Sequence, residues 1–129
     1  MKKYFLWTVM AIVMCSITTF AQRPTRIVFN KGNHSAIISG TLLTYEGKRE
    51  YLVRVRAGQA MKVESIGLKP VSIWIEGPAG SGYVQDLAAD CHGRSEIAPT
   101  ARGDYKLTVQ ECQKADAWRG TFRVKVTVR

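Results

Sequence analysis

The chain of 129 residues has only two histidines and three cysteines, and none of them repeats at the short spacing of a zinc site. It also lacks a glycine-rich phosphate loop after a strand, a G-x-S-x-G turn, an H-E-x-x-H motif and a calcium-loop pattern. No segment has the 3.6-residue period of an amphipathic helix. These absences argue against an enzyme, a metal protein and a protein that carries a cofactor.

Acidic residues are scarce: 10 aspartates and glutamates stand against 19 lysines and arginines, and the formal net charge is +9. Such a balance is compatible with binding to an acidic glycan, an acidic protein surface or nucleic acid, and equally with a solvated surface. Nucleic acid is the least favoured partner, because the basic residues are dispersed along the chain. His34 and His92 lie beside turn residues without an adjacent nucleophile, which favours surface or hydrogen-bonding roles over catalysis and metal binding.

No apolar run reaches the roughly 20 residues that a membrane-spanning helix needs. The longest, Phe5–Ile17, follows two lysines and precedes a small-residue end at Ala21. This pattern is typical of a cleavable secretory signal peptide. We therefore predict that residues 1–21 are removed on export and that residues 22–129 form one domain. We also predict a location in the periplasm or outside the cell, without a membrane anchor.

Cysteine usage agrees with export. Cys15 falls within the leader, so Cys91 and Cys112 are the two cysteines of the mature domain. An even count in an oxidising compartment predicts one disulfide between them. The closed loop of about 20 residues would stabilise the domain by roughly 3 kcal/mol in the chain-entropy model. Because residues 83–95 show no clear pattern, we expect the disulfide to pin this segment to the turn after the strand that contains Tyr105.

Alternation of apolar and polar residues with a period of two recurs through residues 22–129, which predicts half-buried strands. Turn residues separate these segments at intervals of about ten residues, and no helix is available to cover a parallel sheet. We therefore predict an all-β fold, a two-sheet antiparallel β-sandwich of about seven or eight strands. Pro70 lacks a backbone donor and should lie at a strand start or on an edge. The alternation is clear in Arg49–Ala57, Met61–Glu64, Val71–Glu76, Tyr105–Val109 and Phe122–Arg129, less regular in Arg26–Asn30 and Ser35–Leu43, and short in Glu96–Ala98.

Loops at the ends of a rigid sandwich commonly carry recognition residues, and three turn segments contain suitable side chains. One places Tyr45 beside basic residues, and another ends in Tyr83. The third, residues 111–120, combines charges with Trp118 and Arg119. Tyrosine, tryptophan and arginine are enriched at binding hot spots, which favours recognition. Packing beneath a loop explains Trp118 equally well, so both roles stay open for it.

A series of short motifs follows one order along the chain. It consists of Phe29–Gly40, Tyr45, Tyr51, Ala57-Gly58-Gln59 and Val63, then Gly77-Pro78, His92-Gly93, Ile97-Ala98-Pro99, Gly103–Leu107 and a valine-rich last strand. In this order the motifs resemble the bacterial periplasmic inhibitors of g-type lysozyme, over nearly the whole of residues 22–129. The second half is also similar to the small β-sandwich domains appended to secreted bacterial peptidases.

The resemblance to the inhibitors implies a non-catalytic β-sandwich whose loops enter the peptidoglycan-binding cleft of a lysozyme and block it. An inserted arginine or lysine can pair with the catalytic carboxylate, while an aromatic side chain fills a sugar subsite. Tyr45 matches a tyrosine of the family's first recognition loop. The alternative is an exported accessory module that binds a polysaccharide or an acidic protein partner. The family's second, arginine-rich recognition region falls on residues 111–119, where the candidate lysozyme-binding residues are Lys114, Asp116, Trp118 and Arg119.

Overall fold

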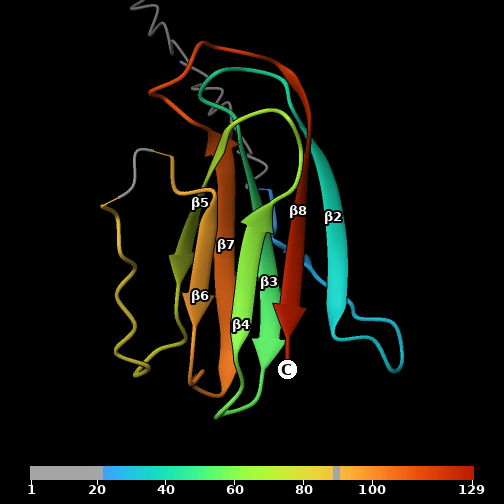
Figure 1. Ribbon diagram of the computed structural model, residues 1–129, viewed down its shortest axis with the longest axis vertical. Helices are drawn as coiled ribbons and strands as arrows, with labels where there is room; N and C mark the ends of the chain where they lie inside the picture. The colour runs from blue at the N-terminus through green and yellow to red at the C-terminus, as the bar shows by residue number, and fades with distance from the viewer. Residues whose placement is uncertain (1–21, 89–90) are drawn as a thin grey trace, which may run out of the picture.

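Eight strands in two sheets form the part of the chain that the computed structural model describes, residues 22–88 and 91–129 (Figure 1). The predicted signal peptide, residues 1–21, lies outside the described residues. The two sheets pack face to face around one apolar core, so the predicted β-sandwich is confirmed. The strands are β1 (Thr25–Arg26), β2 (Ser35–Leu42), β3 (Lys48–Val55), β4 (Met61–Ser65), β5 (Val71–Glu76), β6 (Arg94–Ile97), β7 (Gly103–Glu111) and β8 (Gly120–Val128).

The strand order is β1-β3-β7-β5 in one sheet and β2-β8-β4-β6 in the other. Neighbouring strands are antiparallel, with the exception of β1, which pairs in parallel with β3. Pro70 directly precedes β5, and β5 is an edge strand. Both placements expected for this proline are therefore confirmed.

The first strand is much shorter than the predicted segment Arg26–Asn30. Only Thr25 and Arg26 pair with β3, and a single further hydrogen bond joins Ile27 N to Leu52 O at 2.9 Å. The chain then turns away and closes a turn in which Asn33 N donates to Asn30 O at 2.9 Å. The predicted strand was too long because the alternation continues beyond Arg26, where the pairing with β3 ends.

Side chains at alternate positions of the facing strands fill the core. Burying each large aliphatic or aromatic side chain stabilises a fold by roughly 1.5–3 kcal/mol. The rings of Tyr51 and Phe122 meet edge to face with centroids 6.4 Å apart. Gly40 makes this packing possible, because a Cβ at that position would lie 2.5 Å from the Phe122 ring and 2.7 Å from the Tyr51 hydroxyl oxygen. Phe122 is almost completely buried, as are Leu42, Val53, Met61, Val63, Val71, Ile73, Tyr105, Leu107, Val109, Val124 and Val126.

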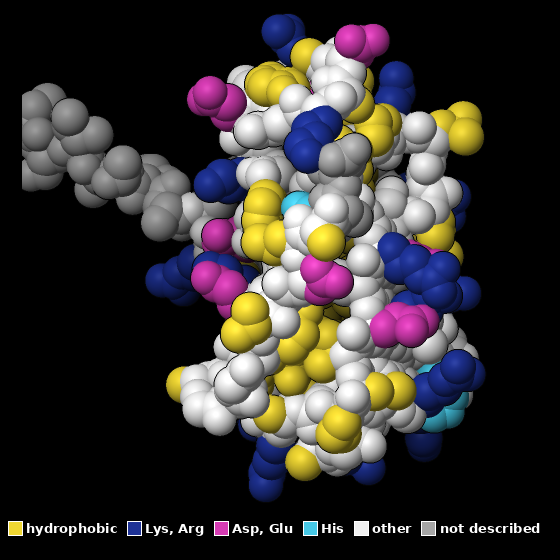
Figure 2. Space-filling model, turned by 60° about the vertical axis from the view of Figure 1, so that its left-hand side comes forward, with side chains coloured by type: hydrophobic (Ala, Val, Ile, Leu, Met, Phe, Trp, Pro, Cys, Tyr) yellow, Lys and Arg dark blue, Asp and Glu magenta, His cyan; other side chains and the backbone are white. Residues whose placement is uncertain are grey.

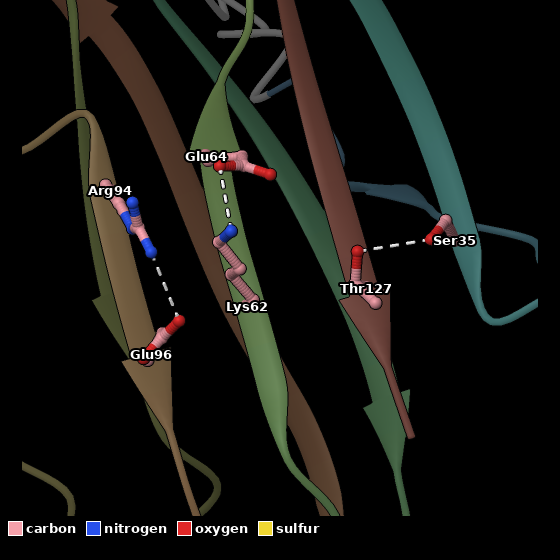
Figure 3. A network of polar contacts seen from close by, with 6 residues as sticks. All are labelled: Ser35, Lys62, Glu64, Arg94, Glu96 and Thr127. Atoms are coloured by element: carbon pink, nitrogen blue, oxygen red, sulfur yellow. Dashed lines mark hydrogen bonds and ion pairs between the residues drawn. The ribbon is translucent and has the colours of Figure 1, made fainter.

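The outer face of the second sheet is polar, as the other half of the alternation requires (Figure 3). Along one strand, Lys62 pairs with Glu64 at 3.2 Å, and along the neighbouring edge strand Arg94 pairs with Glu96 at 3.4 Å. At the opposite edge the hydroxyl groups of Ser35 and Thr127 are 3.2 Å apart. Exposed ion pairs of this kind add little to stability, so they mainly keep this face hydrated.

The segment between β5 and β6 runs beside the edge of β5 and supplies hydrogen bonds that a further strand would otherwise provide. The side chain of Gln85 accepts from Ile75 N at 2.8 Å and donates to Ile73 O at 2.7 Å. One primary amide therefore satisfies both a donor and an acceptor of the strand edge. Edge strands with free donors and acceptors invite pairing between molecules, so this contact protects the sheet.

Candidate functional site

Three connections meet at the upper end of the sandwich in Figure 1: residues 43–47 between β2 and β3, residues 66–70 between β4 and β5, and residues 112–119 between β7 and β8. The first and third contain the candidate lysozyme-binding side chains, whereas Tyr83, from the other turn segment named in the sequence, packs edge to face on Tyr105 with ring centroids 5.9 Å apart. We call these three connections the loop end. The connection 66–70 was not singled out in the sequence, because nothing in its composition indicates that it lies beside the other two.

Tyr45 links the two predicted recognition segments. Its hydroxyl donates to Gln113 O at 3.1 Å, and its side chain is half-buried. The turn that carries it is closed by Gly47 N, which donates to Thr44 O at 3.0 Å. The aromatic ring is therefore held against the β7–β8 loop, where one partner could contact both segments at once.

Trp118 lies in the core, with only 8% of its surface exposed. Its backbone N–H donates to a carboxylate oxygen of Glu111, and its indole N–H donates to Pro70 O at 3.0 Å. The sequence left two roles open for Trp118, partner recognition and packing beneath the loop. Its position corresponds to packing beneath the loop. Through these two bonds Trp118 fastens the β7–β8 loop to the end of β7 and to the residue before β5.

Glu111 is a site residue that the sequence analysis missed. It is fully buried, because it occupies the inward-facing position that follows Tyr105, Leu107 and Val109 along β7. One oxygen accepts the Trp118 backbone N–H, and within residues 22–88 and 91–129 the other has no hydrogen-bond partner. The only available signal was the continued alternation of β7 to a position occupied by an acid.

The predicted disulfide between Cys91 and Cys112 is confirmed, with Cα atoms 5.4 Å apart. Cys112 directly follows the last residue of β7, so the bond pins the segment after β5 to the base of the β7–β8 loop, as expected. Cys112 N also donates to Pro70 O at 3.2 Å. The loop is therefore anchored at both of its ends, by Cys112 and by Trp118.

The remaining candidates of this loop, Lys114, Asp116 and Arg119, are exposed. Two aliphatic side chains lie at the same end of the fold: Leu43 is 71% exposed and Leu68 is fully exposed. Figure 2 shows apolar side chains beside basic and acidic ones at the upper end of the molecule. The loop end thus combines exposed apolar surface, both signs of charge and a backbone that is fixed by hydrogen bonds and a disulfide.

Neither histidine is part of a metal cluster in the described part of the chain, where no group of three or more possible metal-ligating residues occurs. The ring of His92 packs edge to face on Trp74, with centroids 5.2 Å apart. Trp74 is half-buried in this contact. Within the described ranges, no helix could span a membrane.

The described residues thus form a disulfide-pinned β-sandwich with an anchored loop end. Solved structures of the same fold include two periplasmic inhibitors of g-type lysozyme. The one from Aeromonas hydrophila is 21% identical with a TM-score of 0.63, and the match covers 82% of this chain and 96% of the inhibitor. The one from Salmonella Typhimurium is 24% identical with a TM-score of 0.59, and the match covers 84% of this chain and 99% of the inhibitor.

The pre-peptidase C-terminal domain of a collagenase from Bacillus anthracis is also similar, with a TM-score of 0.52 and 16% identity over 84% of this chain and 96% of that domain. Both resemblances seen in the sequence are thereby confirmed at the level of the fold. No family model matches the chain, and no curated protein matches its sequence.

Proposed function

We propose that the protein is a non-catalytic inhibitor of lysozyme, with g-type enzymes as the favoured target, and that its loop end enters the peptidoglycan-binding cleft. The observation that carries this proposal is the hydrogen bond between the Tyr45 hydroxyl and Gln113 O. It joins the two segments in which the sequence resembles the inhibitors' recognition loops. The fold shared with two such inhibitors supports the same proposal.

In this proposal the exposed residues of the loop divide the work of recognition. Arg119 can form a bidentate pair with a catalytic carboxylate, whereas Lys114 offers a single point of charge. Asp116 presents a carboxylate to the basic rim of a cleft, and Tyr45 fills a sugar subsite with its ring. Trp118 is buried and acts as a positioning residue that keeps the loop in place.

The proposal also places the protein in the periplasm or outside the cell after removal of residues 1–21. Intact-mass measurement of the exported protein tests this step, and we expect a chain that begins at Gln22. A product that retains Met1, or one that carries lipid on Cys15, would contradict it.

Inhibition is tested by the loss of turbidity of peptidoglycan suspensions treated with g-, c- and i-type lysozymes. We expect stoichiometric inhibition of a g-type enzyme. If Tyr45 and Arg119 are hot spots, Tyr45→Ala and Arg119→Ala should each weaken inhibition by about 2 kcal/mol or more, roughly thirtyfold. Arg54→Ala and Lys125→Ala serve as matched controls on strand faces and should change inhibition little.

Melting curves of all four variants show whether folding is intact. Absence of inhibition of every g-type enzyme by a folded protein would overturn the proposal. Equal losses in Arg119→Ala and in the two control variants would show that overall charge, and not the loop end, is responsible.

A further inference from the structure

A pocket lies at the end of the sandwich opposite the loop end. The pocket has a volume of about 800 Å³ and opens between the loop that follows β1, the end of β3 and the end of β8. β2 starts directly after His34, which lines this pocket, and finishes at Leu42, next to the loop end. The two sites are therefore separated by the length of the strands, as the lower and upper ends of Figure 1 show.

The floor of this pocket is apolar. This floor consists of the half-buried ring of Phe29 and the buried side chains of Val55 and Val128. Ligand pockets usually hold about 300–1,000 Å³ and combine an apolar lining with a few polar groups. A pocket of this size and lining accommodates a molecule of two or three rings that have apolar faces.

The rim, in contrast, is basic. Arg54, Arg56 and Arg102 line the pocket and are exposed. None of these three guanidinium groups forms an ion pair with any of the residues that the structure describes. The nearby carboxylate of Asp104, which lies opposite Arg54 in the register, is already held by Arg26 through bonds of 2.8 and 3.0 Å. Asp104 also lies within electrostatic reach of Arg54, so the rim carries three exposed guanidinium groups, of which Arg54 is partly balanced by this carboxylate.

Hydrogen bonds fix the backbone around the pocket in advance of any ligand. Val128 N donates to His34 O at 2.8 Å, which ties the loop after β1 to the end of β8. Arg56 N donates to the Gln59 side chain at 2.7 Å, and Arg56 O accepts the hydroxyl of buried Thr100 at 2.6 Å. The walls thus need little ordering when a ligand binds, which favours affinity.

We propose that this pocket binds a short oligosaccharide that carries carboxylates. Guanidinium groups pair with carboxylates in bidentate fashion, and the apolar face of a sugar ring suits the floor formed by Phe29 and the two valines. Nucleic acid fits less well, because single strands are bound by successive aromatic side chains and this pocket offers one. The carboxylates could belong to uronic-acid rings or to the peptide stems of peptidoglycan fragments.

Calorimetric titration at low salt with four probes tests this site: a trigalacturonate, a disaccharide–tetrapeptide fragment of peptidoglycan, neutral chitotriose and trithymidylate. We expect at least one of the two carboxylated saccharides to bind about tenfold or more tightly than chitotriose and trithymidylate. The tighter of the two identifies the source of the carboxylates. The double substitution Arg54→Ala with Arg102→Ala should weaken that binding by roughly tenfold or more.

The matched control is Arg123→Ala with Lys125→Ala, which removes the same charge from the outer face of β8 and should leave binding within about twofold. The proposal would be overturned if neither carboxylated saccharide bound. It would also be overturned by equal losses of binding in the two double variants, or by tighter binding of trithymidylate than of both carboxylated saccharides. Lysozyme inhibition is measured on the same variants. It should be unaffected in both, so failure of this pocket and failure of the inhibitor function are told apart.

Discussion

Replacing Glu111 with alanine should destabilise the fold by about 2–3 kcal/mol, because a buried donor left without its partner costs roughly 1–3 kcal/mol and the lost packing adds to this cost. The substitution removes the acceptor of the Trp118 backbone N–H and leaves that donor buried without a partner. It also opens a small cavity at a fully buried position. For a domain of about 100 residues, a loss of this size lowers the melting temperature by roughly 10 °C or more.

Glu111→Gln is the matched control. Its side-chain carbonyl can still accept the Trp118 N–H, and its amide nitrogen takes the place of the carboxylate oxygen that has no partner within the described residues. Because this hydrogen bond and the packing are both kept, the glutamine variant should lose less than about 1 kcal/mol. Urea unfolding followed by tryptophan fluorescence gives both free energies, and equal slopes of the transitions show that the same folded state unfolds.

The two variants also separate the anchoring of the loop from its contacts. At a temperature where all proteins are folded, Glu111→Ala should weaken lysozyme inhibition, because it loosens the segment that ends in Trp118 and Arg119. Glu111→Gln should inhibit like the original protein. An alanine variant as stable as the original chain, or a glutamine variant as damaged as the alanine variant, would refute the assignment of Glu111 as the anchor of this loop.

Three further variants test the fold. Cys91→Ala with Cys112→Ala should lower the free energy of unfolding by roughly 3 kcal/mol, since the disulfide closes a sequence separation of 21 residues; an unchanged melting temperature would contradict this. Gly40→Ala should lower the free energy of unfolding, measured by urea unfolding, by about 1–3 kcal/mol, because the added methyl group overpacks the core. An unchanged free energy would show that the Phe122 ring moves away without cost. The hydrogen bond from Arg26 holds the pKa of Asp104 below its ordinary value, so this pair stabilises the fold above about pH 3.9 and loses its effect as the pH falls through the lowered pKa. The melting temperature of Asp104→Asn should therefore lie below that of the original protein at neutral pH and converge with it in acid, and a difference that persists in strong acid would contradict the assignment.

The alternation of apolar and polar residues was sufficient to predict the sandwich, because it shows that each strand has one buried face and one exposed face. The five clearly alternating segments correspond to β3, β4, β5, β7 and β8, with ends that differ by a few residues. The parallel pairing of β1 was not predictable, since alternation says nothing of which strand lies alongside or in which direction. The disulfide was predicted because the signal peptide indicated an oxidising compartment and residues 22–129 contain two cysteines.

The candidate site was predicted less completely, because its parts are joined by contacts across the chain. The Tyr45 turn and the segment around Arg119 were both identified, yet their contact depends on a hydrogen bond between residues 68 positions apart. Glu111 was missed because the predicted alternation was followed only to Val109, whereas β7 extends to Glu111 and this acid faces inward. The pocket beside Phe29 draws its lining from residues between 29 and 128, so no local motif could have indicated it.

The side-chain amide of Gln85 has a consequence for the behaviour of many copies of this protein together. The amide that occupies the edge of β5 belongs to the same chain, so its local concentration does not change with the amount of protein. A strand from a neighbouring copy competes for the same donor and acceptor only in proportion to its own concentration. Intermolecular pairing must therefore outcompete tethered groups, and Gln85 acts together with His92 O, which accepts from Ile73 N at 2.9 Å, to raise the protein concentration at which copies would pair along that edge.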